Sequence, residues 1–97
     1  MWVITEKRLK NFYQTHPNAK ASALAWLKLM KRHDFSSFNE LRRVFPSADD
    51  VGMLTIFNIG GNNYRLVADV VYGKGRVYIK HTFTHAEYDA WNKKGRP

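Results

Sequence analysis

The chain has 97 residues, of which 44% are hydrophobic and 14% aromatic, which is enough for one small domain over residues 1–97 but not for two. No apolar run approaches the length that spans a bilayer, and no secretory-type leader opens the chain, so we expect neither a membrane protein nor an exported one. Sixteen Lys and Arg residues against eight Asp and Glu residues leave a net charge of +8, which predicts a polyanionic partner such as RNA, DNA, an acidic protein or an anionic membrane surface.

The first third of the chain predicts a strand followed by two helices. Residues 2–5 have the pattern of a short strand. From Glu6 to His16, apolar residues recur at helical spacing, and Thr5 is placed to cap this helix. Pro17 ends it, and a second helix is expected from about Ala19 to Arg32. Two helices joined by so short a break form a hairpin that can pack on a sheet.

The remaining two thirds predict mainly strands. Residues 34–46 have the pattern of a loop with one helical turn capped by Ser37, and Asp49, Asp50 and Gly52 continue the loop. Glycine-rich turns then separate three predicted strands, which are Met53–Ile59, Tyr64–Tyr72 and Arg76–Phe83. A last helix is expected from Thr84, followed by a frayed basic end over residues 93–97.

The alternation of side chains along these strands predicts two different faces, if both hairpin loops contain an even number of residues. One face is apolar and is expected under the helices, with Met53, Thr55, Phe57, Leu66, Ala68, Val70, Tyr72, Val77, Ile79, His81 and Phe83. The other is mostly polar and uncovered, with Asn58, Arg65, Val67, Asp69, Val71, Arg76, Tyr78, Lys80 and Thr82. This register makes Asp69 a cross-strand neighbour of Lys80. The expected fold is therefore α+β, with a helical hairpin on one face of a small antiparallel sheet and a short C-terminal helix.

Arg65 is the first candidate site residue on the polar face. It follows the turn Gly60–Asn63, with Asn58 beside it or directly across from it. A guanidinium held on a strand can bind a phosphate through two parallel hydrogen bonds. The alternative is an ordinary surface arginine paired with Asp69. The glycines of the turn are explained by a tight hairpin, so they predict structure and not a phosphate-binding loop.

The segment Thr84-His85-Ala86-Glu87 predicts a capping box at the start of the last helix. His85 then lies in the first helical turn with Tyr88 one turn later, and the two are candidates for proton transfer. The alternative is structural, with Tyr88 in a hydrophobic staple and His85 merely exposed. His81 is expected in the core. Because the chain has no cysteine and no clustered carboxylates beside these histidines, we expect no metal site.

Two segments together resemble the HigB-type toxins of bacterial toxin–antitoxin pairs. They are FNIGGNNYRLVADVVY (residues 57–72) and VYIKHTFTHAEYDAW (residues 77–91), and the opening WVITEKRLKNFYQTHP and the segment VFPSAD fit the same pattern. This group belongs to the RelE-like superfamily, in which N-terminal helices pack on one face of an antiparallel sheet. The resemblance therefore implies the same fold that the residue pattern predicts.

The resemblance also implies an endoribonuclease that cuts messenger RNA on translating ribosomes without a metal or other cofactor. In the implied reaction the 2′-hydroxyl of the RNA attacks the adjacent phosphate, leaving a 2′,3′-cyclic phosphate and a free 5′-hydroxyl. Arg65 would stabilise the phosphate, and Lys80 and Asn58 would bind and position the RNA. His85 and Tyr88 would be the acid and base, in an order that the resemblance leaves open.

The implied partners are the messenger RNA, the ribosome and a HigA-like antitoxin with a helix-turn-helix domain, through which alone the toxin would reach operator DNA. A cytoplasmic location without membrane contact follows from that target. Two alternatives remain at this point. One is a ParE-like toxin that inhibits DNA gyrase on the same scaffold, and the other is a non-catalytic nucleic-acid-binding module.

Overall fold

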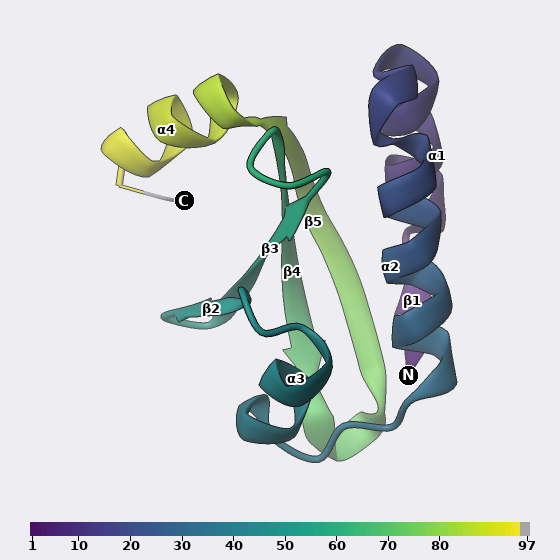
Figure 1. Ribbon diagram of the computed structural model, residues 1–97. Helices are drawn as coiled ribbons and strands as arrows, with labels where there is room; N and C mark the ends of the chain where they lie inside the picture. Colours follow the sequence, from purple (N-terminus) through teal and green to yellow (C-terminus); the bar gives the residue numbers. More distant parts are fainter. Residues whose placement is uncertain (96–97) are drawn as a thin grey trace.

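The computed structural model describes residues 1–95, which form a five-stranded sheet with helices on both sides (Figure 1). The strands are β1 (Trp2–Ile4), β2 (Asp49–Val51), β3 (Leu54–Ile59), β4 (Tyr64–Val71) and β5 (Arg76–Thr84). The helices are α1 (Glu6–Thr15), α2 (Lys20–Arg32), α3 (Phe38–Val44) and α4 (His85–Lys93), with short 3-10 turns at Pro17–Ala19 and Tyr72–Lys74. The predicted α+β class is confirmed. None of the helices within residues 1–95 has both the length and the apolar character needed to cross a bilayer.

The strand order is β1-β5-β4-β3-β2, and every pair except one is antiparallel. The exception is β1, which runs parallel to β5 with Trp2 opposite Arg76 and Ile4 opposite Tyr78. The sheet is therefore mixed, because the strand that precedes the helical hairpin joins its edge.

The segment around Asp49 was predicted to be a loop, and this is wrong. Asp49–Val51 forms the edge strand β2, which pairs with β3 through a two-residue connection. Gly52 has a φ of 64° there, a conformation that glycine adopts without strain. Met53, predicted to face the core, is 89% exposed because it lies in this connection.

The large core lies between the α1–α2 hairpin and one face of the sheet. The hairpin contributes Leu9, Phe12, Ala23, Trp26 and Met30, and the sheet contributes Phe57, Leu66, Ala68, Val77 and Ile79. All ten side chains are buried, and full burial stabilises the folded state by about 1.5–3 kcal/mol for each large apolar side chain. The predicted core face is thus confirmed for these five strand residues.

A β-bulge at Lys80 moves the side chains of the second half of β5 to the opposite faces of the sheet from those predicted. Ile79 lies opposite Ala68 and His81 lies opposite Val67, so Lys80 has no partner across the ladder. The extra residue reverses the alternation of side chains beyond it. The prediction that His81 and Phe83 face the large core is therefore wrong.

Two polar residues also differ from the prediction. Thr82 lies opposite Leu66, on the face of the helical hairpin, although it was predicted on the polar face. Asp69 lies opposite Tyr78, so the predicted cross-strand pair of Asp69 and Lys80 is not formed. The Thr82 error follows from the bulge, because the extra residue shifts every later pair. The Asp69 error has another cause, since Asp69 and Tyr78 pair between the bulge and the β4–β5 turn, and this turn is centred one residue earlier than predicted.

Thr5, between β1 and α1, was predicted to cap the helix, but its side chain makes no capping hydrogen bond. Its hydroxyl instead donates to the carbonyl of Ile79 at 2.9 Å and accepts from the Ile79 N–H at 3.1 Å. Its φ of 69° lies in the left-handed region that β-branched residues rarely adopt. The hydroxyl therefore extends the pairing of β1 and β5 by one residue, up to the edge of the bulge.

A second, smaller apolar cluster lies on the opposite face of the sheet, under α4 (Figure 1). The predicted capping box is confirmed, with Glu87 N–H donating to the Thr84 hydroxyl at 3.2 Å and Thr84 N–H donating to the Glu87 carboxylate at 2.8 Å. Trp91 is 9% exposed and packs with Ile56 and Val67. The face that was predicted to be uncovered is thus partly covered by α4.

Two further element ends can be compared with the prediction, the start of α3 and the end of α4. Ser37 accepts a hydrogen bond from the Glu40 N–H and caps α3 as predicted. Of the basic end expected to fray, Lys93 is the last residue of α4, and residues 96–97 lie outside the described residues.

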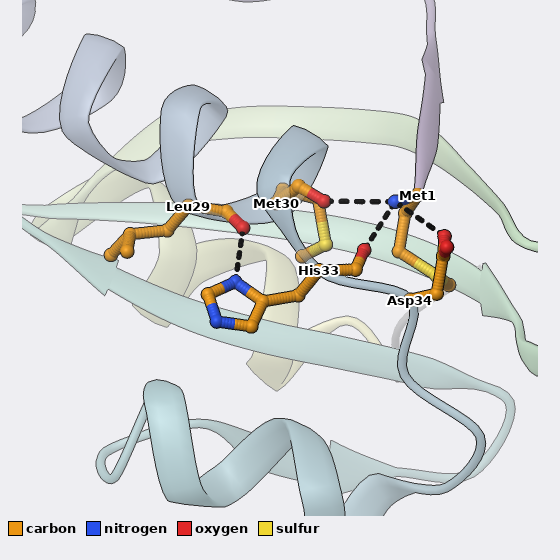
Figure 2. A network of polar contacts seen from close by, with 5 residues as sticks. All are labelled: Met1, Leu29, Met30, His33 and Asp34. Carbon is orange, nitrogen blue, oxygen red and sulfur yellow. Dashed lines mark hydrogen bonds and ion pairs between the residues drawn. The ribbon is translucent and has the colours of Figure 1, made fainter.

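The α-amino group of Met1 binds the C-terminal end of α2 (Figure 2). It donates to the carbonyls of Met30, at 3.0 Å, and of His33, and it lies 3.1 Å from a carboxylate oxygen of Asp34. The imidazole Nδ1 of His33 lies 2.8 Å from the Leu29 carbonyl. Since the last carbonyls of a helix have no partners within it, these contacts satisfy two of them, those of Leu29 and Met30, and fix β1 against α2.

Candidate active site

Arg65 lies at the start of β4, and its side chain is held by two backbone carbonyls. Its Nη1 atom donates to Asn62 at 3.1 Å and to Tyr64 at 3.0 Å. The guanidinium carbon lies 5.8 Å from the centre of the Tyr88 ring, within the range of a cation–π contact. Because these groups restrain one side of the guanidinium, its other N–H groups are available for a phosphate.

Asn58 is the partner of Arg65 across the β3–β4 ladder. The turn between them has Gly60 and Gly61 at φ values of 63° and 68°, and a side chain at Gly60 would bring its Cβ to 3.1 Å from the Tyr64 ring. The glycines are therefore required by the turn, which confirms their structural interpretation.

The turn also fixes the start of α4, because the His85 N–H donates to the Asn63 carbonyl at 2.9 Å. This bond brings the beginning of α4 to the same end of the sheet as Arg65. Tyr88, one turn along α4, is half-buried, and its ring lies 5.9 Å from that of Trp91. The packing of Trp91 on the sheet thus determines where Tyr88 lies relative to Arg65.

His85 is exposed and pairs with a residue that the sequence analysis missed. Its Nδ1 atom lies 3.2 Å from the Asp89 carboxylate, one helical turn later. When Nδ1 carries the proton that bonds to this carboxylate, Nε2 is the atom that can accept a proton. The spacing of four residues between a histidine and an aspartate on a predicted helix is the signal that could have identified this pair.

Lys80 lies apart from this group. The residue opposite Arg65 on β5 is Phe83, and a strand rises about 3.3 Å per residue, so Lys80 is displaced along the strand by about 10 Å. The Lys80 ammonium lies 5.8 Å from the centre of the Tyr78 ring. The backbone carbonyl of Lys80 accepts a hydrogen bond from the Arg8 side chain. Of the predicted site residues, Arg65, Asn58, His85 and Tyr88 therefore lie at one end of the sheet and Lys80 does not.

The group can bind an anion and transfer protons. It combines a fixed cation, a phenol and an oriented imidazole around the β3–β4 turn. Residues 1–95 hold no cluster of three or more His, Cys, Asp or Glu side chains that could bind a metal ion. A guanidinium beside a phenol and an imidazole is an arrangement that can bind a phosphodiester and exchange protons with it.

Comparison with known proteins gives the family. Residues 19–91 match the model of the HigB toxin family, described as the RelE-like toxic component of a toxin–antitoxin system. The mRNA interferase toxin HigB of Escherichia coli strain K12 is 36% identical over 92 residues, covering 92% of this chain and 88% of that protein. An mRNA interferase HigB of Shigella flexneri has the same identity and coverage. An mRNA interferase HigB of Escherichia coli O6:H1 is 29% identical, covering 92% of this chain and 89% of that protein.

The family match covers α2, α3, most of α4 and all strands except β1, so it includes each predicted site residue. The chain therefore belongs to the HigB toxin family, the RelE-like toxic components of toxin–antitoxin systems.

Proposed function

We propose that this protein is the toxin of a type II toxin–antitoxin pair and is an endoribonuclease that cleaves messenger RNA on translating ribosomes. The observation that carries the proposal is the contact of the Arg65 guanidinium with the Tyr88 ring, next to the His85–Asp89 pair. Family membership, the names of the curated relatives and the net charge of +8 support it independently.

The proposed reaction is metal-independent attack of the 2′-hydroxyl on the adjacent phosphate. His85 Nε2 accepts the proton of the 2′-hydroxyl while the bond from the 2′-oxygen to phosphorus forms. Arg65 binds the non-bridging oxygens, whose negative charge increases in the pentacoordinate state. The bond to the 5′-oxygen breaks, and that oxygen takes a proton from the Tyr88 hydroxyl. The products are a 2′,3′-cyclic phosphate and a 5′-hydroxyl, and solvent restores the protons.

Two further residues have supporting roles in this scheme. Asp89 holds the imidazole of His85 in the tautomer that leaves Nε2 free. Asn58, across the ladder from Arg65, positions the sugar or a phosphate oxygen with its amide. Lys80 contributes to RNA binding at a distance from the cleaved bond.

The proposed partners are the ribosome, which presents the messenger RNA, and a HigA-like antitoxin with a helix-turn-helix domain. The basic surface suits both, since ribosomal RNA and an acidic antitoxin segment are both anionic. The toxin would meet operator DNA only within the complex with the antitoxin, and it would act in the cytoplasm.

Mapping of transcript 5′ ends after induction of the chain without an antitoxin tests this function. We expect new ends inside translated regions that carry 5′-hydroxyls. Arg65→Ala should lose the cleavage by a factor of about 100 to 1,000, as removal of one transition-state donor does. Arg76→Ala is the matched control, because Arg76 also stacks on an aromatic ring, that of Trp2 at 5.7 Å, but at the other end of β5. Intact transcripts together with relaxed or broken DNA would overturn the proposal in favour of a gyrase inhibitor.

A further inference from the structure

A cavity of about 400 Å³ lies between α1 and the second half of β5. It exists because β1 ends at Ile4, opposite Tyr78, so within residues 1–95 no strand pairs with that edge of β5 beyond the bulge. Helix α1 runs beside this edge, as Figure 1 shows. The lining of the cavity comes from α1 and the adjoining His16, from residues 80–83 of β5, and from Glu87 of α4.

The cavity is electropositive. Arg8 and Lys80 line it, and Arg8 Nη1 donates to the Lys80 carbonyl at 3.0 Å, which holds the guanidinium at the bulge. Its one carboxylate, that of Glu87, already accepts a hydrogen bond from the Thr84 N–H in the capping box. Burial, Arg8 and Lys80, in that order, lower the pKa of His81, which also lines the cavity. The positive charges of Arg8 and Lys80 therefore both lie close enough to His81 to lower its pKa, within one cavity.

The cavity adjoins the candidate active site. Phe83 lines it and is the residue opposite Arg65, and Glu87 lines it and directly precedes Tyr88 in α4. The Phe83 and His81 rings stack, with centres 5.1 Å apart. An extended polyanion that has one phosphate at Arg65 therefore reaches the cavity along β5.

We propose that this cavity binds a second backbone phosphate of the RNA strand, close to the one that is cleaved, with Arg8 and Lys80 as its ligands. The inference rests on the proposed function, because it takes the strand to be the substrate. Under this proposal Lys80 binds a phosphate away from the cleaved bond. Arg8, which no sequence motif indicated, becomes a second RNA-binding residue. The bulge then has a role, since it places Lys80 and His81 next to each other on the cavity wall.

Binding of a non-cleavable RNA tests the proposal directly. The probe is a fluorescent single-stranded RNA with 2′-O-methyl groups, which lacks the attacking hydroxyl, and its affinity for the full chain is measured by anisotropy at several salt concentrations. Arg8→Gln and Lys80→Gln should each weaken binding about tenfold, as loss of one charge-assisted hydrogen bond does. Each should also reduce the slope of log affinity against log salt by about 0.7, the value for one phosphate of a single strand. Lys10→Gln, on the exposed side of α1, should change neither quantity.

A second readout separates this site from general electrostatics. Proton NMR titration of His81 should show that the methylated RNA raises its pKa, because a bound phosphate stabilises the imidazolium. Cleavage of messenger RNA on translating ribosomes by Arg8→Gln should show a raised KM with kcat retained, whereas Arg65→Ala loses kcat. If Arg8→Gln and Lys80→Gln bind RNA like Lys10→Gln while Arg65→Ala fails to cleave, the second phosphate site is refuted and the nuclease stands. If induction of the unaltered chain leaves transcripts intact, the proposed function itself is refuted, whatever the binding assay gives.

Discussion

Replacement of Thr5 tests whether its hydroxyl stabilises the sheet next to the bulge. Thr5→Val keeps the shape of the side chain and the left-handed φ of 69° but removes both hydrogen bonds to Ile79. A net contribution of about 0.5–1.5 kcal/mol for each bond predicts a loss of about 2 kcal/mol in the free energy of unfolding. For a domain of this size that loss lowers Tm by about 10 °C.

Two further substitutions at the same position separate the hydrogen bonds from the backbone strain. Thr5→Ser keeps the hydroxyl and should be within about 0.5 kcal/mol of the unaltered chain. Thr5→Gly also loses the hydroxyl but relieves about 1–2 kcal/mol of left-handed strain, partly offset by the entropy of glycine, so its stability should lie between those of Ser and Val. Urea unfolding followed by circular dichroism gives all three values. A Val variant as stable as the Ser variant would refute the role of the hydroxyl.

The remaining predictions concern the two sides of β5. Because the pKa of His81 is lowered in the folded state, the unfolded chain binds more protons just below about pH 6.5, and stability should fall as the pH drops from there; His81→Gln should remove this part of the pH dependence in urea titrations. Asp89→Ala should reduce kcat for RNA cleavage about tenfold without a measurable change in Tm, since its partner His85 is half exposed; an unchanged kcat would contradict the orienting role. Trp91→Ala should cost about 3 kcal/mol in unfolding free energy, and it should lower cleavage through displacement of α4 even where the chain remains folded.

Much of this fold could be predicted because its signals are local. The apolar spacing of Leu9 and Phe12 defines α1, the glycines of the Gly60–Asn63 turn define the β3–β4 hairpin, and Thr84 with Glu87 defines the start of α4. Each pattern involves residues within one or two turns of one another, so the sequence contains the whole interaction. The same locality explains why Asn58 could be placed beside or opposite Arg65.

The features that escaped prediction depend on distant partners. Lys80 continues the alternation of apolar and polar residues that an unbroken strand would have, so nothing near it indicates a bulge. Threonine is a common helix-capping residue, so Thr5 was expected to cap α1. Only the approach of Ile79, far along the chain, gives its hydroxyl another partner. Strand β2 contains two aspartates and a valine, and aspartate disfavours strands. The segment forms a strand because β3 presents a free edge, which cannot be seen from the propensities of its own residues.

The division of β5 between two clusters has a mechanical consequence. Val77 and Ile79 anchor the strand in the large core, whereas Phe83 belongs to the small cluster beneath α4. Opening of that small cluster would therefore swing His85 and Tyr88 away while Arg65 stayed fixed on the sheet. Amide exchange in α4 should accordingly be faster than in α2, and any ligand that slows it would be tightening the proposed active site itself.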